Sequence, residues 1–382
     1  MRRLNLKSIW WLPVAAITLA ACGGTDPVDD VLEEMDPPQT EYIEEGEELE
    51  GGEGLEVQGE VDENNEEEDM ISSITDEEAE EIEEEKGGTV TESAMTELYL
   101  LDRNGYVAAQ TMNIPRSSNE VQAAVEYLVQ GGPVTEMLPN GFQAVLPPGT
   151  EVLDSEVSNG VATVDLSEHF AEYHPDQELQ VLQALTWTLT QLDDVDRVML
   201  RMNGEELTEM PQNGTPISSG YTRGHGINLE TDNVSDLVDT KPVVVYFLSQ
   251  TDDLQTYYVP VTRRVPNNMD SYEAVVNELL EGPALMSGLL NDFSREVELL
   301  DNPQLASNGT LTLNFNEALR SQLEGTAVSQ DVLNMLVLSL TEQPDVRDVA
   351  IQVESDDTIM VSTGETITEP VSRPTNVNTG EY

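Results

Sequence analysis

The stretch that decides the fold is VQAAVEYLVQGGP, residues 121–133, and it returns as YEAVVNELLEGP at residues 272–283. In both copies the apolar residues recur at the spacing of one helix face, which gives Val121, Ala124, Val125, Leu128 and Val129, then Tyr272, Val275, Val276, Leu279 and Leu280. A Gly-Pro pair closes each stretch, as is typical where a helix ends. The sequence therefore contains one amphipathic helix twice, about 150 residues apart.

Short polar motifs predict where this helix begins and where a hairpin turns. Ser117 with Glu120, and Asp270 with Glu273, resemble the spacing of a capping box. Further along each copy, an Asn-Gly pair follows a serine, as Ser158-Asn159-Gly160 and as Ser307-Asn308-Gly309. Asn-Gly tolerates the positive φ angles of a type I′ turn, so we expect a tight hairpin in each copy.

Four more elements complete the repeat. A second helix carries a leucine stripe in each copy, made of Leu182, Leu185 and Leu189, then Leu333, Leu336 and Leu340. Alternating apolar residues at 198–202 and 349–353 predict a closing strand with one face in the core and one nearer water. Two opening strands are expected in each copy, at 97–101 and 106–114, then at 243–248 and 256–265.

The order of these elements predicts an α+β fold. Each copy has the order β-β-α-β-β-α-β, and two helices with one apolar stripe each can cover one face of a small mixed sheet. We therefore expect two tandem two-layer sandwich domains. The expected parts are a signal peptide (1–21), an acidic disordered tether (22–94), domain 1 (95–205), a linker (206–241), domain 2 (242–362) and a disordered tail (363–382).

The N-terminus has the layout of an export signal. Arg2, Arg3 and Lys7 precede an apolar run of about a dozen residues that is too short to span a bilayer comfortably. The run ends in Leu-Ala-Ala before Cys22, the only cysteine of the chain. This ending resembles the lipobox of bacterial lipoproteins, and the resemblance implies that Cys22 becomes a lipid anchor on the extracytoplasmic face of the cell membrane. The alternative is an ordinary signal peptide with a chance cysteine.

Composition limits the partners. The chain of 382 residues has 75 acidic and 16 basic residues and a formal net charge of −59. Nucleic acid is excluded as a partner, because phosphate binding needs a basic surface. Residues 23–93 alone hold 30 Asp or Glu and one basic residue, Lys86, which predicts a disordered tether between lipid and folded part. With one cysteine, stability must come from hydrophobic cores.

The repeat and the lipobox together resemble the GerM family of spore germination proteins, and the repeated unit resembles its GerMN domain. The similar blocks are 124–133 with 274–283, 161–170 with 310–319, and 181–202 with 332–353. The resemblance implies a membrane lipoprotein used in sporulation and germination, which contacts other envelope or sporulation-complex proteins. It also implies a fold similar to ring-building modules, with association between copies left open. It supplies no catalytic residues and no cofactor.

No residue pattern indicates catalysis or a metal site, so we expect no enzyme, no cofactor and no metal. His169 and His174 lie five residues apart, whereas a metal pair on one helix face prefers a spacing of four. Asp165 with Glu168 is the most plausible acid pair, but the second copy has Asn314 with Glu317, so we expect Asp165 to cap a turn. No G-x-S-x-G elbow and no phosphate-binding loop are present.

The remaining candidates are contact residues. Trp187 points away from the leucine stripe of its helix, so it either buries against a loop or contacts another subunit. The outward side of the closing strands offers Met199, Arg201, Ala350 and Gln352. The leading hypothesis is a non-enzymatic scaffold anchored to the membrane, in which two like modules dock multivalently. The alternative is an extracytoplasmic lipoprotein, outside sporulation, that binds a small ligand or a cell-wall fragment.

Overall fold

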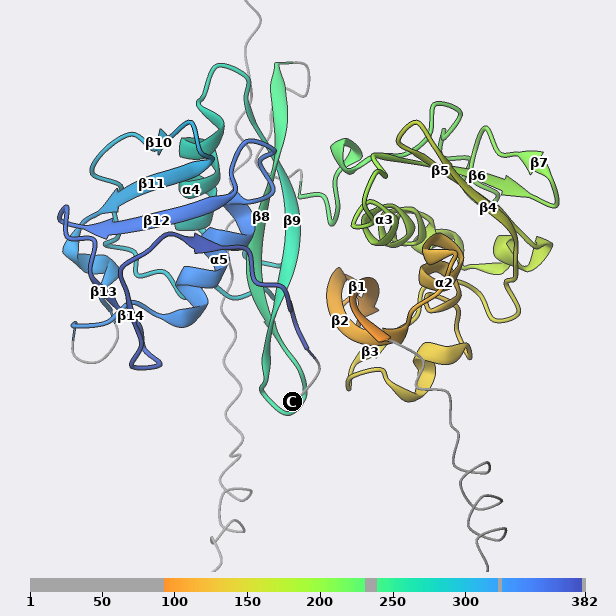
Figure 1. Ribbon diagram of the computed structural model, residues 1–382, viewed down its shortest axis with the longest axis horizontal. Coiled ribbons are helices and arrows are strands. Elements are labelled where there is room, and N and C mark those ends of the chain that lie inside the picture. Colours follow the sequence, from red (N-terminus) through yellow and green to blue (C-terminus); the bar gives the residue numbers. More distant parts are fainter. Residues whose placement is uncertain (1–92, 231–238, 322–324, 380–382) are drawn as a thin grey trace, which may run out of the picture. The chain divides into compact units, whose positions relative to one another are not determined.

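The computed structural model describes residues 93–230, 239–321 and 325–379. The expected signal peptide, Cys22 and the tether up to residue 92 lie outside the described residues. We call residues 93–230 module 1 and residues 239–379 module 2 (Figure 1).

Both modules have the expected order of elements. Module 1 consists of β1 (Ser93–Asp102), β2 (Val107–Pro115), α2 (Glu120–Glu126), β3 (Phe142–Gln143), β4 (Val152–Ser158), β5 (Val161–Leu166), α3 (Glu178–Leu189), β6 (Arg197–Met202) and β7 (Glu205–Glu206). Module 2 consists of β8 (Thr240–Gln250), β9 (Thr256–Pro266), α4 (Ser271–Glu281), β10 (Gln304–Leu305), β11 (Thr310–Phe315), α5 (Gln330–Leu340), β12 (Asp348–Val353), β13 (Ile359–Met360), β14 (Thr366–Ile367) and β15 (Val371–Ser372). Short 3-10 turns include Pro133–Glu136, Glu168–Glu172, Pro175–Gln177, Arg223–His225 and Glu317–Leu319.

The α+β class and the tandem arrangement are confirmed, with one difference in the sheets. In each module the first two strands form a long antiparallel hairpin, β1–β2 or β8–β9. The later strands form a separate mixed sheet, in the order β4-β5-β6-β7 or β10-β11-β12-β15. The central pairs β5–β6 and β11–β12 are parallel, and the helices α3 and α5 make the crossovers.

A helix hydroxyl explains why the strands divide into two sheets where one was expected. The backbone N–H of Tyr99 in β1 donates to Thr188 Oγ1 in α3 at 2.9 Å. Module 2 repeats this contact from Tyr246 in β8 to Ser339 Oγ in α5, also at 2.9 Å. These side chains satisfy backbone groups of a strand edge that a further strand would otherwise pair. The helix therefore lies between the hairpin and the mixed sheet, as Figure 1 shows for α5 in module 2.

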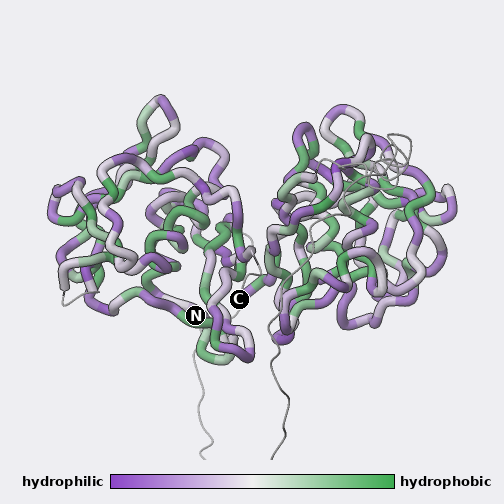
Figure 2. Tube along the Cα trace, turned by 60° about the horizontal axis from the view of Figure 1, so that its bottom comes forward, coloured by the Kyte–Doolittle hydropathy of each residue, from purple (hydrophilic) through white to green (hydrophobic). Residues whose placement is uncertain are grey.

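The central helix of each module is buried on almost every side. In α3 the stripe residues Leu182, Leu185 and Leu189 are at most 1% exposed. Thr186 and Thr188, on other sides of the same helix, are equally buried. Each fully buried leucine contributes about 1.5–3 kcal/mol to folding. Figure 2 shows hydrophobic residues concentrated along the inner strands and helices of each module, with hydrophilic residues in the outer loops.

The helix ends agree with the sequence in module 2 and differ in module 1. Asp270 caps α4 as expected, because its side chain accepts from the N–H groups of Tyr272 and Glu273, and Gly282 (φ 84°) ends the helix. In module 1 the cap is Asn119 rather than Ser117. There α2 stops at Glu126, well before Gly132, because Val129 forms a parallel bridge with Leu146 instead of continuing the helix.

The two Asn-Gly turns differ. In the first, Asn159 (φ 50°) and Gly160 (φ 79°) both have positive φ, as the predicted type I′ turn requires. In the second, only Gly309 (φ 87°) is positive, and its N–H donates to Ala306 O at 3.0 Å. The expected type I′ turn at Asn308 is therefore wrong, because this loop is longer and its glycine alone takes the left-handed conformation.

The expected linker and the expected loose tail are both folded in their described parts. Tyr221 bridges to Val198 of β6 in module 1, and Val371 of β15 pairs with Val349 of β12 in module 2. Residues 206–230 and 363–379 therefore occupy matching places, and both belong to the repeated unit. Their Gly, Thr, Pro and Asn content suggested loops, but each segment closes the edge of its own mixed sheet.

Candidate functional site: the module junction and the exposed sheet faces

Two asparagines join the modules by bridging β2 to β9. The side-chain amide of Asn228 donates to Val107 O and to Pro260 O, both at 2.7 Å, and its oxygen accepts from Val107 N. Asn378 does the same in reverse. It donates to Tyr258 O and to Ala109 O and accepts from Tyr258 N.

These two sets of contacts are equivalent under a pseudo-two-fold operation. Pro115 and Pro266 close β2 and β9, so Val107 corresponds to Tyr258 and Ala109 corresponds to Pro260. Asn228 and Asn378 also correspond, because each ends the closing segment of its module. Each asparagine thus binds one residue of its own hairpin twice and one residue of the other hairpin once.

The residues before these asparagines exchange between modules. Ile227, at the end of module 1, pairs with Thr262 of β9, and its N–H donates to Thr262 Oγ1 at 2.8 Å. Val377, at the end of module 2, pairs with Thr111 of β2, and its N–H donates to Thr111 Oγ1 at 2.8 Å. Ile227 is 0% exposed and Val377 is 2% exposed. Each module therefore adds a short strand-like segment to the hairpin of the other.

A carboxylate with two arginines forms the polar centre of the junction. Glu342, at the end of α5, lies 3.0 Å from Arg223 Nη1 and 3.1 Å from Arg373 Nη1, and its side chain is 8% exposed. Arg223 also binds Thr190 Oγ1 in module 1 at 2.8 Å, so it links both modules. The arginines correspond in the two closing segments, whereas the carboxylate occurs once, because Gln191 stands at the equivalent place in module 1.

The same cluster shifts two carboxyl groups in opposite directions. Burial alone would raise the pKa of Glu342, but Arg373 and Arg223, with the Tyr246 hydroxyl, hold it below its usual range. Burial raises the pKa of Glu97, and the same two arginines offset this effect only in part. Glu97 accepts a hydrogen bond from Gln191. The junction therefore contains one firmly ionised carboxylate and one that retains its proton more readily than usual.

Trp187 lies inside this structure, although it was a candidate contact for another subunit. Its side chain is 1% exposed. The ring is 5.5 Å from the ring of Tyr99, and the Arg223 guanidinium lies 4.3 Å from its centre. Of the two alternatives, burial against a loop holds, because the segment around Arg223 folds over this face of α3.

The four strand candidates are half-buried and stay accessible in part. Met199 and Arg201 alternate with the buried Val198 and Leu200 of β6, as the period of two predicted. Arg201 Nη2 lies 3.9 Å from Glu156 Oε1 in β4, a long and exposed ion pair. Their side chains therefore stand on the face of the mixed sheet that does not carry α3.

The corresponding face of module 2 contains a small hollow. Ala350 and Gln352 of β12 line a hollow of about 200 Å³, together with Ile359 of β13 and Ile367 of β14. The β13–β14 hairpin borders this hollow, and its counterpart in module 1 is the single antiparallel bridge between Glu209 and Pro216. The two outward faces are therefore related by the repeat, and their four candidate residues are buried to a similar degree.

The acidic residues and histidines that the sequence analysis considered lie in turns or at the surface. Asp165 accepts from the N–H of Gly204, and Asn314 likewise accepts from Ser355, so both fix the turn after the neighbouring parallel strand. His174 is exposed beside Asp176, and the ring of His225 stacks on Tyr221 at 4.2 Å. Within residues 93–230, 239–321 and 325–379, no group of three or more His, Cys, Asp or Glu is placed to hold a metal ion.

The junction residues were missed by the sequence analysis, although a signal exists. Thr222-Arg223 precedes Ile227-Asn228 by the same spacing as Ser372-Arg373 precedes Val377-Asn378. This pattern of hydroxyl, arginine, three residues, β-branched residue and asparagine recurs at the period of the repeat. It was overlooked because composition alone predicted a linker for the first segment and a disordered tail for the second.

These features define a class of protein: a tandem of two α+β modules that are joined by exchanged closing segments. The chain belongs to the Germane family, described as "Sporulation and spore germination", whose model matches residues 97–208 and 244–358. The resemblance seen in the sequence is thereby confirmed.

Sequence and structural similarity to known proteins supports this family membership. The chain is 43% identical over 371 residues to the spore germination protein GerM of Bacillus subtilis (strain 168), which covers 96% of each chain. The solved structure of the tandem GerMN domains of the sporulation protein GerM from Bacillus subtilis matches with a TM-score of 0.71 and 48% identity, over 76% of this chain and 100% of that one. The chain is therefore a protein related to sporulation or germination. Among its described residues, no helix has the length and apolar character needed to cross a membrane.

Proposed function

We propose that this chain is a non-enzymatic scaffold of the sporulation envelope, held on the outer face of the cell membrane by lipid at Cys22. Its two modules bind envelope or sporulation-complex proteins through the outward faces around Met199 and Arg201 and around Ala350 and Gln352. The relationship to the sporulation protein GerM supports the setting.

The observation that carries the proposal is the exchange of closing segments. Because Asn228 and Asn378 each hold both hairpins, the modules act as one body with two related faces. Two linked faces raise the effective concentration of the second contact once the first has formed. Asp165, part of the most plausible acid pair, accepts from the N–H of Gly204 and fixes a turn, which supports a structural role for it.

Photo-crosslinking in sporulating cells tests this role. A crosslinking residue is placed singly at positions 199, 201, 350 and 352, with the exposed Glu172 as a surface control and the buried Trp187 as an internal one. We expect the same defined partner from at least one position in each module and none from the two controls. Capture patterns that do not differ from position 172 would contradict the scaffold role.

Multivalent docking and anchoring have separate tests. Met199→Asp and Ala350→Asp should each reduce recovery of that partner by more than half, and the pair should abolish it. If recovery after the double change equals that of one single change, only one face binds.

Cys22→Ser should move the exported protein from the membrane to the soluble fraction, because acyl chains supply stable anchoring. Unchanged membrane association would contradict lipid attachment.

A further inference from the structure

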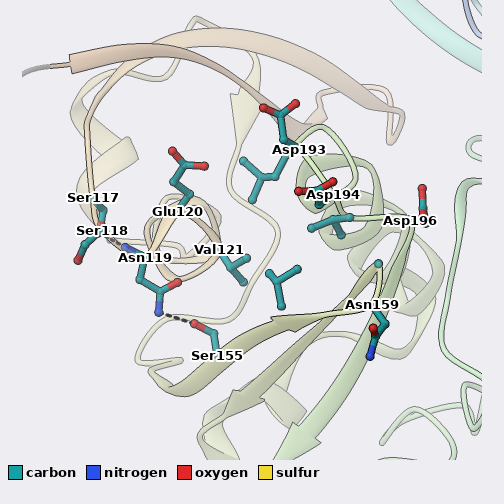
Figure 3. A pocket seen from close by; sticks show the side chains of 14 residues that line it. Ser117, Ser118, Asn119, Glu120, Val121, Ser155, Asn159, Asp193, Asp194 and Asp196 are labelled. Atoms are coloured by element: carbon teal, nitrogen blue, oxygen red, sulfur yellow. Dashed lines mark hydrogen bonds between the residues drawn. The ribbon is translucent and has the colours of Figure 1, made fainter.

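Module 1 has an open groove lined by carboxylates. A hollow of about 940 Å³ lies between the start of α2, the β4–β5 turn and the turn from α3 to β6 (Figure 3). Glu120, Asp193, Asp194 and Asp196 stand around it. A second hollow of about 230 Å³ continues it toward Ala94 and shares Glu120 and Asp193 with it.

These four carboxylates are not neutralised by neighbours. In the part of the chain that the structure describes, none of them takes part in an ion pair. Arg116 is the one basic residue that lines either hollow; it borders the smaller one together with Ala94 and Glu120. Leu192 and Val121 add apolar surface. The groove therefore suits a side chain with an apolar stem and a positive end.

The same place in module 2 is filled by a lysine of the chain itself. Lys241 stands opposite Val265 in the β8–β9 hairpin, as Ala94 stands opposite Ile114 in β1–β2, and in each case the next residue closes the second strand with proline. The Lys241 ammonium donates to Met269 O at 2.6 Å and to Ser271 Oγ at 2.8 Å.

The groups that hold this ammonium have counterparts in the groove. Met269 and Ser271 flank the helix cap Asp270, just as Ser118 and Glu120 flank the helix cap Asn119. Ser118 and Glu120 both line the large hollow. Module 1 thus keeps the receiving positions, with a carboxylate in place of the Ser271 hydroxyl, but has Ala94 where module 2 supplies the cation.

The charges at neighbouring positions also differ between the two modules. By the repeat, Asp193 and Asp196 of module 1 correspond to Pro344 and Arg347 of module 2. Module 2 therefore has an internal ammonium and fewer carboxylates, whereas module 1 has more carboxylates and no internal ammonium at this place. The two differences complement each other.

We propose that the groove of module 1 binds a lysine side chain from an extended segment of a partner protein, in the place that Lys241 takes in module 2. The partner rests on the proposed scaffold role, but binding of the lysine does not. An ammonium fits better than a metal ion, because the described carboxylates do not converge as metal ligands. The partner's lysine stem packs on Leu192 and Val121 while its ammonium meets Glu120 and Ser118 O.

The test uses residues 93–382, since the tandem domains of the Bacillus subtilis relative form a solved structure by themselves. The probe is a capped heptapeptide of alternating glycine and lysine, and the control peptide has norleucine in place of lysine. Amide NMR shifts are followed during titration. We expect saturable shifts at residues 117–121 and 192–196 with the lysine peptide alone.

Matched variants separate the groove from general acidity. Ala94→Lys should place an internal ammonium in the groove and weaken binding at least tenfold. Glu136→Gln changes the net charge equally at an exposed site outside the groove and should alter binding less than twofold. Equal weakening by both variants, or shifts spread over the acidic surface, would overturn the proposal.

Two further outcomes are decisive. If Ca²⁺ produces the same shifts and displaces the peptide, the groove is a cation site and the lysine assignment is wrong. If the peptide binds as expected but crosslinks at positions 199, 201, 350 and 352 give no partner, the groove stands and the scaffold role fails.

Discussion

The two modules share one backbone plan and differ in the charges placed on it. Both retain the residues that make the reciprocal contacts: Thr111 and Thr262, Arg223 and Arg373, Asn228 and Asn378. At the centre of the junction the copies diverge, because Glu342 corresponds to Gln191 and Glu97 corresponds to Val244 in the repeat.

This difference shows which contacts the duplication keeps. Hydrogen bonds to the backbone of β2 and β9 are needed on both sides of the pseudo-axis, so their residues recur. A single Glu342 can serve both arginines, so a second carboxylate at position 191 is unnecessary. Repetition therefore preserves the geometry of pairing, while one copy supplies the carboxylate that both arginines share.

The largest expected effect comes from removing that single carboxylate. Glu342→Ala leaves Arg223 and Arg373 largely buried and without their shared partner, and we expect the free energy of unfolding to fall by about 3 kcal/mol. The counterpart Gln191→Ala removes a neutral group and should cost about 1 kcal/mol. Urea denaturation of both variants gives the comparison. Equal losses would show that the negative charge of Glu342 contributes nothing beyond what the neutral Gln191 contributes.

The loss of side-chain hydrogen bonds at the two asparagines is expected to have a smaller effect, and it should be the same on both sides. Asn228→Ala or Asn378→Ala removes three hydrogen bonds, and we expect each to cost about 2–3 kcal/mol at about 1 kcal/mol per bond. Both residues have positive φ, 45° and 53°, which adds strain for alanine.

Glycine variants at the two positions serve as controls, because they lose the same hydrogen bonds without that strain. Hydrogen exchange at β2 and β9 should report the loss together with the change in unfolding free energy. A difference of more than about 1 kcal/mol between the two alanine variants would contradict the pseudo-two-fold equivalence.

The elements of this fold were predictable from the sequence where burial repeats locally. Apolar periodicity placed α3 and β6 within a few residues, because each buries a regular face. The division into two sheets was not predictable, since it depends on Thr188 and Ser339 meeting strands about 90 residues away. The closing segments were wrongly predicted for a related reason. Tyr221 and Val371 pair with strands of their own module, and Ile227 and Val377 pair with the other module, so no local periodicity revealed these contacts.

The candidate contact residues were likewise predictable only in part. Alternation in β6 and β12 correctly placed Met199 and Ala350 on the outward side of their strands. Trp187 was ambiguous, because a single apolar residue off the stripe does not reveal what covers it. The cover is Arg223, which the sequence analysis had placed in a linker.

The smallest expected effect is a pH dependence that distinguishes Glu97 from Glu342. The pKa of Glu97 is raised in the folded state, so the stability that it contributes is full below its unfolded value near 4.5 and is lost as pH rises through the folded pKa. The pKa of Glu342 is lowered, so its contribution is present above its unfolded value near 4.5 and is lost as pH falls through the folded pKa.

Neutral substitutions should therefore act with opposite sign. Glu97→Gln removes the charge but keeps an acceptor for Gln191, so its stability relative to the unchanged protein should rise between pH 4 and pH 7. Glu342→Gln should show the reverse, with its loss growing over the same range. Urea midpoints at four or five pH values measure both trends. The Glu97 effect is the smaller, because Arg373 and Arg223 already offset part of its burial. Parallel trends would contradict the prediction, because they would mean that the pKa values of Glu97 and Glu342 are shifted in the same direction.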